Sequence, residues 1–190
     1  SLISYLKVDG SRQIIGEEEY NHLVEAATVK LGAKFDRPGH AMQIYFMRDP
    51  NRIRPILNKQ IEASQVTARN VGIEVDDLLG ERVSNLSTIL SHEECYIVLW
   101  TRPSIMTKTE AERTKKDQLE QRKKWVNAPY GQNPLAGLEA LKTRHNSYVS
   151  SIEQALNELG MRAELLEVHE AIKAVRNNMF PTKAHDHWRA

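Results

Sequence analysis

The 190-residue chain lacks the features that mark several protein classes. Its single cysteine, Cys95, excludes an intramolecular disulfide and favours a reducing compartment. No apolar run approaches the roughly 18 residues that a membrane-spanning helix requires. The chain has 26 Lys and Arg residues and 25 Asp and Glu residues, which gives a net charge of +1. A charge this small produces no overall electrostatic attraction to nucleic acid or to acidic membranes. The 41% hydrophobic and 27% charged residues are typical of a globular protein with a core.

Nucleotide-binding loops are also missing. None of the nine glycines begins a GxxxxGK(S/T) pattern, and no GxGxxG occurs. Such loops hold phosphate through closely spaced backbone amides, so we expect no cofactor to bind this piece through a standard loop. No motif gives a positive reason to regard residues 1–190 as an enzyme by themselves. Since the chain begins at Ser1 and not at Met, we expect a piece of a longer protein.

The most apolar stretch is residues 95–100, CYIVLW. Its β-branched and aromatic residues suit a pleated surface, and its lack of alternation predicts a strand covered on both faces, in the centre of a sheet. A buried helix segment is the alternative. Six residues are short for a helix, and Pro103 closes the run, so we prefer the strand.

The remaining periodic segments predict an α+β fold with a mixed β-sheet and packed helices. Further strands are expected at 2–8 and 12–15, joined by an Asp9-Gly10 hairpin turn, and at 41–47 and 161–168. Helices are expected at 17–34, 50–71, 76–90, 107–125, 136–159 and 170–179. This order suggests one domain over 1–190 with a ferredoxin-like, split βαβ arrangement, in which 104–135 is a charged insertion and loop.

Histidines supply the candidate metal ligands, but each has a simpler explanation. The densest group, His185-Asp186-His187, is typical of a solvated tail. The others are His92 at a polar strand start, His145 at the edge of a helix core and His169 at a helix start. We therefore expect no metal site. Cys95 beside His92 is an equally weak catalytic pair, because a thiol within an apolar run has a raised pKa.

One basic cluster is a candidate contact with a partner or a membrane. It consists of Arg113, Lys115, Lys116, Arg122, Lys123, Lys124 and Trp125. Basic side chains beside an aromatic bind phosphates and a base, or an anionic lipid surface. Acidic residues are interleaved, however, and Glu112 stands four residues before Lys116, as in a self-compensated solvated helix. That solvated helix is the alternative interpretation.

The series of segments along the chain resembles a known family. The segments are IIGEEEY at 14–20, RPGHAMQIYF at 37–46, DDLLGERV at 76–83, HEECYIVLWTRP at 92–103, RHNSYVSSI at 144–152 and LEVHEAIKAVR at 166–176. They resemble the N-terminal region of the DotO (IcmB) ATPases of Dot/Icm type IVB secretion systems, which are conjugation-type, VirB/TraC-like ATPases. The resemblance covers nearly the whole chain, although no segment is diagnostic alone.

The resemblance implies an N-terminal assembly domain that precedes a RecA-like motor. ATP and Mg²⁺ are then expected in the motor, the full-length protein is expected to be an ATPase and a homo-oligomer, and no catalytic residue falls within 1–190. The implied partners are other subunits of the ATPase complex and the inner-membrane secretion machinery, at the cytoplasmic face of the bacterial inner membrane. The rival hypothesis is a nucleic-acid-binding α+β module of a conjugation protein. A small-molecule enzyme would need a polar cleft, which the sequence does not display.

Overall fold

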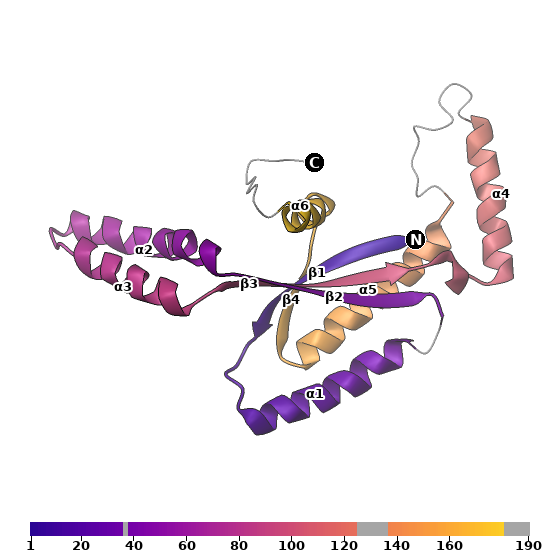
Figure 1. Ribbon diagram of the computed structural model, residues 1–190. Helices are drawn as coiled ribbons and strands as arrows, with labels where there is room; N and C mark the ends of the chain where they lie inside the picture. Colours follow the sequence, from indigo (N-terminus) through magenta and orange to yellow (C-terminus); the bar gives the residue numbers. More distant parts are fainter. Residues whose placement is uncertain (36–37, 125–136, 181–190) are drawn as a thin grey trace. The chain divides into compact units, whose positions relative to one another are not determined.

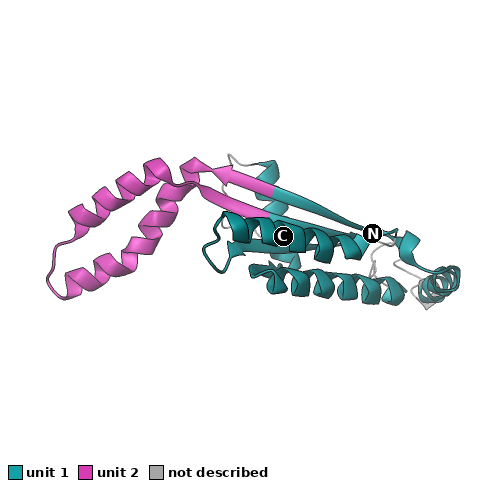
Figure 2. Ribbon diagram, turned by 90° about the horizontal axis from the view of Figure 1, so that it is seen from below, with its two compact units in different colours: residues 1–45, 96–190 teal, residues 46–95 magenta. Residues whose placement is uncertain are grey.

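A computed structural model describes residues 1–35, 38–124 and 137–180 (Figure 1). The elements in chain order are β1 (Leu2–Ser11), α1 (Glu17–Gly32), η1 (Ala33–Phe35), β2 (His40–Asp49), η2 (Pro50–Arg52), α2 (Ile53–Asn70), α3 (Asp76–Ile89), β3 (His92–Thr101), η3 (Pro103–Ile105), α4 (Lys108–Lys124), α5 (Glu139–Glu158), β4 (Met161–Leu165) and α6 (Val168–Met179). They divide into two compact units. Unit 1 comprises residues 1–45 and 96–190, and unit 2 comprises residues 46–95 (Figure 2).

The four strands form one antiparallel sheet in the order β2-β3-β1-β4. This is the order of a ferredoxin-like fold built from β1-α1-β2 and β3-α5-β4, with α2 and α3 inserted between β2 and β3. The predicted α+β class is therefore confirmed. In β3, Tyr96, Ile97, Val98 and Leu99 are all buried, whichever face they point to. The predicted central strand, covered on both sides, is confirmed as well.

In unit 1 the two faces of the sheet are covered differently (Figure 1). Leu6, Ile97 and Leu99 pack against the apolar stripe of α5, which includes Ile152 and Leu156. Leu31 near the end of α1 joins this core from its edge, but no residue of α1 is fully buried. The amphipathic helix α6 lies over the opposite face, where its side chains and those of the sheet line an apolar cavity of about 230 Å³.

The predicted hairpin at Asp9-Gly10 is wrong. β1 continues to Ser11 and pairs antiparallel with β4, with a register shift between Val8 and Gly10. Gly10 has a φ of 102°, and this permits the irregularity without a reversal of the chain. Residues 12–15 form no strand, because β4 already supplies the partner that the hairpin would have needed. The helix expected from residue 170 begins at Val168, with a capping box between Glu167 and Glu170.

Unit 2 contains the helical hairpin of α2 and α3. The predicted Asp49-Pro50 start is confirmed, because Asp49 Oδ1 accepts a hydrogen bond of 2.9 Å from the Asn51 amide. The hairpin has a small buried core of Ile53, Leu57 and Val83. It exposes the apolar side chains of Val66, Val71, Ile73, Leu78, Ile89 and Leu90. A hairpin of this length therefore leaves much of its apolar surface in water.

Candidate functional site

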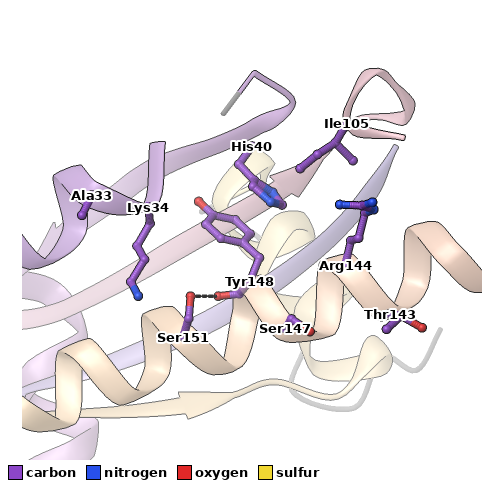
Figure 3. Close-up of a pocket in the computed structure, with 9 residues that line it drawn as sticks. All are labelled: Ala33, Lys34, His40, Ile105, Thr143, Arg144, Ser147, Tyr148 and Ser151. Atoms are coloured by element: carbon purple, nitrogen blue, oxygen red, sulfur yellow. Dashed lines mark hydrogen bonds between the residues drawn. The ribbon is translucent and has the colours of Figure 1, made fainter. Parts of the chain in front are cut away.

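A polar cavity of unit 1 lies along α5 and is called the α5 pocket below (Figure 3). Its volume is about 570 Å³, within the usual range of about 300–1,000 Å³ for ligand pockets. It is lined by Ala33, Lys34, His40, Ile105, Thr143, Arg144, Ser147, Tyr148 and Ser151. These residues come from η1, the start of β2, η3 and α5, so only the folded chain assembles them.

Behind the pocket, a hydroxyl joins two imidazoles. Thr101 Oγ1 lies 2.9 Å from His145 Nδ1 and 3.1 Å from His40 Nδ1, and Ser4 Oγ lies 2.8 Å from His145 Nε2. A hydroxyl carries one proton, so Thr101 donates to one imidazole and accepts from the other. The two neutral rings therefore carry their protons on different nitrogens. This network ties β1, β2, β3 and α5 together.

Burial keeps both histidines neutral. It lowers the pKa of His40, although a hydrogen bond to the Trp100 backbone opposes the change, and the charge of Arg144 lowers it further. Burial also lowers the pKa of His145, and the neighbouring His40 adds to the effect. Burial raises the pKa of Tyr148 to about 12. The wall of the pocket is thus uncharged at neutral pH, apart from its lysine and arginine.

His40 is held in place by stacking and by the turn before it. Its ring stacks on Tyr148 with a centroid distance of 4.0 Å and an interplanar angle of 20°. Gly39, at φ 117°, accepts a hydrogen bond of 2.7 Å from the Arg102 amide. A Cβ at Gly39 would lie 2.8 Å from Ile105 Cβ and 3.1 Å from its amide nitrogen. Only glycine fits this approach, which brings His40 beside Thr101.

Arg144 is fixed by the first turn of α4. Its Nη2 donates to Glu110 Oε1 at 2.8 Å and to Oε2 at 3.0 Å. Glu110 also accepts from the Thr107 amide at 2.8 Å, while Thr107 Oγ1 accepts from the Glu110 amide at 3.3 Å, which is a capping box. The Thr107 backbone and side chain, together with Arg144, lower the pKa of Glu110 to about 2. The ion pair therefore persists far into the acid range.

The basic cluster lies outside this pocket. Arg113, Lys115 and Lys116 are exposed on α4. Arg122, Lys123 and Lys124 continue the backbone of the same helix, and Trp125 falls outside the described residues. The helix expected over 107–125 is present as α4, but its role in binding stays a prediction. Among residues 108–121 of this helix, Thr114 alone is buried, in keeping with the strongly charged sequence.

The other candidate residues have ordinary structural roles. The expectation that His145 is a satisfied core histidine is confirmed, since both its ring nitrogens have partners. His92 Nε2 lies 2.9 Å from Glu94 Oε1 at the start of β3. Burial raises the pKa of Cys95, as expected. His185-Asp186-His187 lies outside the described residues, and within the described ranges no three His, Cys, Asp or Glu residues are placed to hold a metal ion.

Sequence reasoning missed the α5 pocket, although parts of it are readable. Thr107-Lys108-Thr109-Glu110 matches the S/T-x-x-E pattern of a capping box. Thr143, Ser147 and Ser151 recur every four residues, which places one hydroxyl on each turn along one side of α5. No local pattern reveals that His40 and Thr101 meet these residues, because that meeting depends on the pairing of β2 with β3.

Comparisons with protein-family models, curated proteins and solved structures find no match to this chain. Among the helices that the structure describes, none has the length and apolar character needed to cross a membrane. Functional inference therefore rests on the residues and on the fold.

Proposed function

We propose that the chain is the N-terminal assembly domain of a type IVB secretion ATPase. It connects the motor to neighbouring subunits and to the inner-membrane machinery that exports effector proteins, and it works at the cytoplasmic face of the bacterial inner membrane. The segment series that resembles the DotO (IcmB) family supports this proposal, as does the α+β fold with helical insertions. The missing P-loop is consistent with a motor that lies elsewhere in a longer protein.

The observation that carries the proposal is the exposed apolar surface of the α2–α3 hairpin. Val71, Ile73 and Leu78, at the turn between the helices, are 65%, 56% and 68% exposed. Ile89 near the end of α3 is 76% exposed. Several large apolar side chains exposed on one small helical hairpin are a feature of contact sites between proteins. A neighbouring subunit of the same ATPase is the partner that this proposal assigns to them.

The test uses the full ATPase with its motor. Ile73→Glu and Leu78→Glu place carboxylates at the turn of the hairpin without touching the core of unit 2. We expect these variants to lower the assembled fraction in light scattering after size exclusion, while each protein remains folded by circular dichroism. Leu119→Glu, at an exposed leucine of α4, is the matched control and should assemble normally. Unchanged assembly of the hairpin variants refutes the role of this surface.

A second measurement addresses the motor directly. Residues 1–190 alone should show no ATP hydrolysis, whereas the longer protein should. Measurable turnover by the isolated domain contradicts the proposal, because it would require a nucleotide site that the sequence does not supply.

Nucleic-acid binding remains the second candidate because Arg113, Lys115 and Lys116 are exposed together on α4. Binding through these side chains predicts an affinity that falls steeply with salt, as phosphate contacts exchange with counterions. A filter-binding series from low to moderate salt decides the matter. Absence of binding at low salt removes this candidate.

A further inference from the structure

We propose that the α5 pocket binds a small, hydroxylated phosphate monoester. Two cationic side chains, Lys34 and Arg144, line the pocket, and none of its nine described lining residues is acidic. Three serine and threonine side chains and the Tyr148 phenol complete the polar wall. Cations with convergent hydrogen-bond donors are the groups that recognise a phosphate dianion. The site differs from the surface of the α2–α3 hairpin and does not depend on the role proposed for that hairpin.

Arg144 is organised before any ligand arrives. It is only 30% exposed, and Glu110 holds one terminal nitrogen, Nη2. Those contacts leave the Nη1 and Nε hydrogens to donate singly to ligand oxygens, because both two-pronged faces of a guanidinium include Nη2. Because the ion pair fixes the side chain, little rotamer entropy is lost when a ligand binds.

The hydroxyls continue the site along α5. Thr143 donates to the carbonyl of Glu139 and Ser151 to the carbonyl of Tyr148, each at 2.9 Å, so both retain acceptor capacity. Ser147 stands between them, and Figure 3 shows Lys34 on the Ser151 side and Arg144 on the other. Cations on two sides of a hydroxyl row suit a ligand with one charged group and several hydroxyls.

The stacked rings of His40 and Tyr148 form one wall of the α5 pocket. Both rings are uncharged, and Tyr148 is only 4% exposed, so this wall offers no charge that competes for the cationic side chains. A volume of about 570 Å³ accommodates glycerol phosphate or a sugar phosphate. The same chemistry occurs on a free metabolite and on the headgroup of phosphatidic acid, so the experiment has two arms.

In the first arm, the full chain is titrated with glycerol 3-phosphate by calorimetry. Arg144→Gln and Ser147→Asp should each weaken binding by about tenfold or more, the first by removing a charged donor and the second by adding a carboxylate. Lys142→Gln changes the same charge on an exposed residue of α5 that does not line the pocket, and it should bind normally. Ser147→Asn has the size of the aspartate without its charge, and it should bind more tightly than Ser147→Asp. Because Ser147 is exposed, neither substitution at this position disturbs the core.

In the second arm, the chain is sedimented with vesicles that contain phosphatidic acid or only phosphatidylcholine. Binding to glycerol 3-phosphate alone assigns the site to a free ligand. Selective binding to phosphatidic acid that is lost in Ser147→Asp assigns it to a lipid headgroup. Absence of binding in both arms overturns the proposal, and so does binding that Arg144→Gln and Ser147→Asp leave unchanged.

Discussion

Thr101 offers the sharpest test of how the buried polar network contributes to stability. Its side chain is fully buried, and its hydroxyl is hydrogen-bonded to Nδ1 of both His40 and His145. Thr101→Val keeps the shape of the side chain and removes only the hydroxyl. The variant therefore leaves two ring nitrogens without their partner and creates no cavity.

The magnitude follows from the burial of the two rings. An unsatisfied buried polar group costs about 1–3 kcal/mol. His145 is only 5% exposed and bears this cost fully, whereas His40 lines the α5 pocket and is partly rehydrated there. We expect Thr101→Val to lower the free energy of unfolding by about 2–4 kcal/mol. Thr101→Ser keeps the hydroxyl and loses one buried methyl group, at a cost of about 1 kcal/mol.

Urea denaturation at pH 7.5, followed by far-UV circular dichroism, measures both variants against the unsubstituted chain. We expect the unsubstituted chain to be the most stable, Thr101→Ser to be intermediate and Thr101→Val to be the least stable. A valine variant as stable as the unsubstituted chain, or more stable than the serine variant, refutes the claim that the hydroxyl organises the histidines.

Three further predictions concern the same unit. The free energy of unfolding should fall as the pH is lowered from 7.5 to 5.5. The reason is that His40 and His145 have lowered pKa values in the folded chain, whereas in the unfolded chain they take up protons near the ordinary histidine pKa of 6.5. Urea titrations of the unsubstituted chain and of His145→Gln measure this pH dependence, which should be smaller in the variant. Gly39→Ala should destabilise by about 1–3 kcal/mol, since its φ is positive and the new Cβ meets Ile105; thermal unfolding measures this. Leu99→Ala should cost about 2–5 kcal/mol in urea denaturation, because Leu99 is completely buried.

Each of these predictions has a matched control. His22→Gln, at an exposed histidine of α1, should leave the pH dependence unchanged. Gly32→Ala should be tolerated, because no described atom outside its own helical backbone and its two chain neighbours lies within 4 Å of the added Cβ. Leu119→Ala should change stability by less than about 0.5 kcal/mol, since this leucine is 57% exposed. A control variant that matches its test variant contradicts the corresponding argument.

The sequence predicts those elements whose pattern is local and strong. The apolar run of β3 and the stripe of α5 need no knowledge of the fold, because burial on both faces and burial on one helical face leave different periods. The ferredoxin-like order also follows once strands and helices are placed. The Asp9-Gly10 turn fails because a turn dipeptide describes only its own residues, whereas β4 decides the pairing of β1 from far along the chain.

The α5 pocket is less predictable for the same reason. His40 and Thr101 stand 61 positions apart, and Arg144 meets Glu110 across 34. Apart from Glu110 in its capping box, none of these residues belongs to a recognisable sequence motif. They come together because Gly39 packs closely against Ile105 and because α4 contacts α5 through Glu110 and Arg144. A small-molecule enzyme is the third hypothesis, and it needs a polar cleft that the sequence does not display. The structure contains a polar cavity, which supports binding of a small molecule without indicating a reaction.

The chain leaves the sheet at the end of β2 and comes back almost to the point of departure, since Arg48 Nε donates to Ser91 Oγ at 2.7 Å. Residues 50–91 therefore act as one long connection between β2 and β3. The entropic cost of closing such a connection rises only slowly with its length. A change in the length of this hairpin therefore costs little closure entropy and leaves the four strands in place. The surface that the hairpin exposes and the fold of the sheet can change independently at this junction.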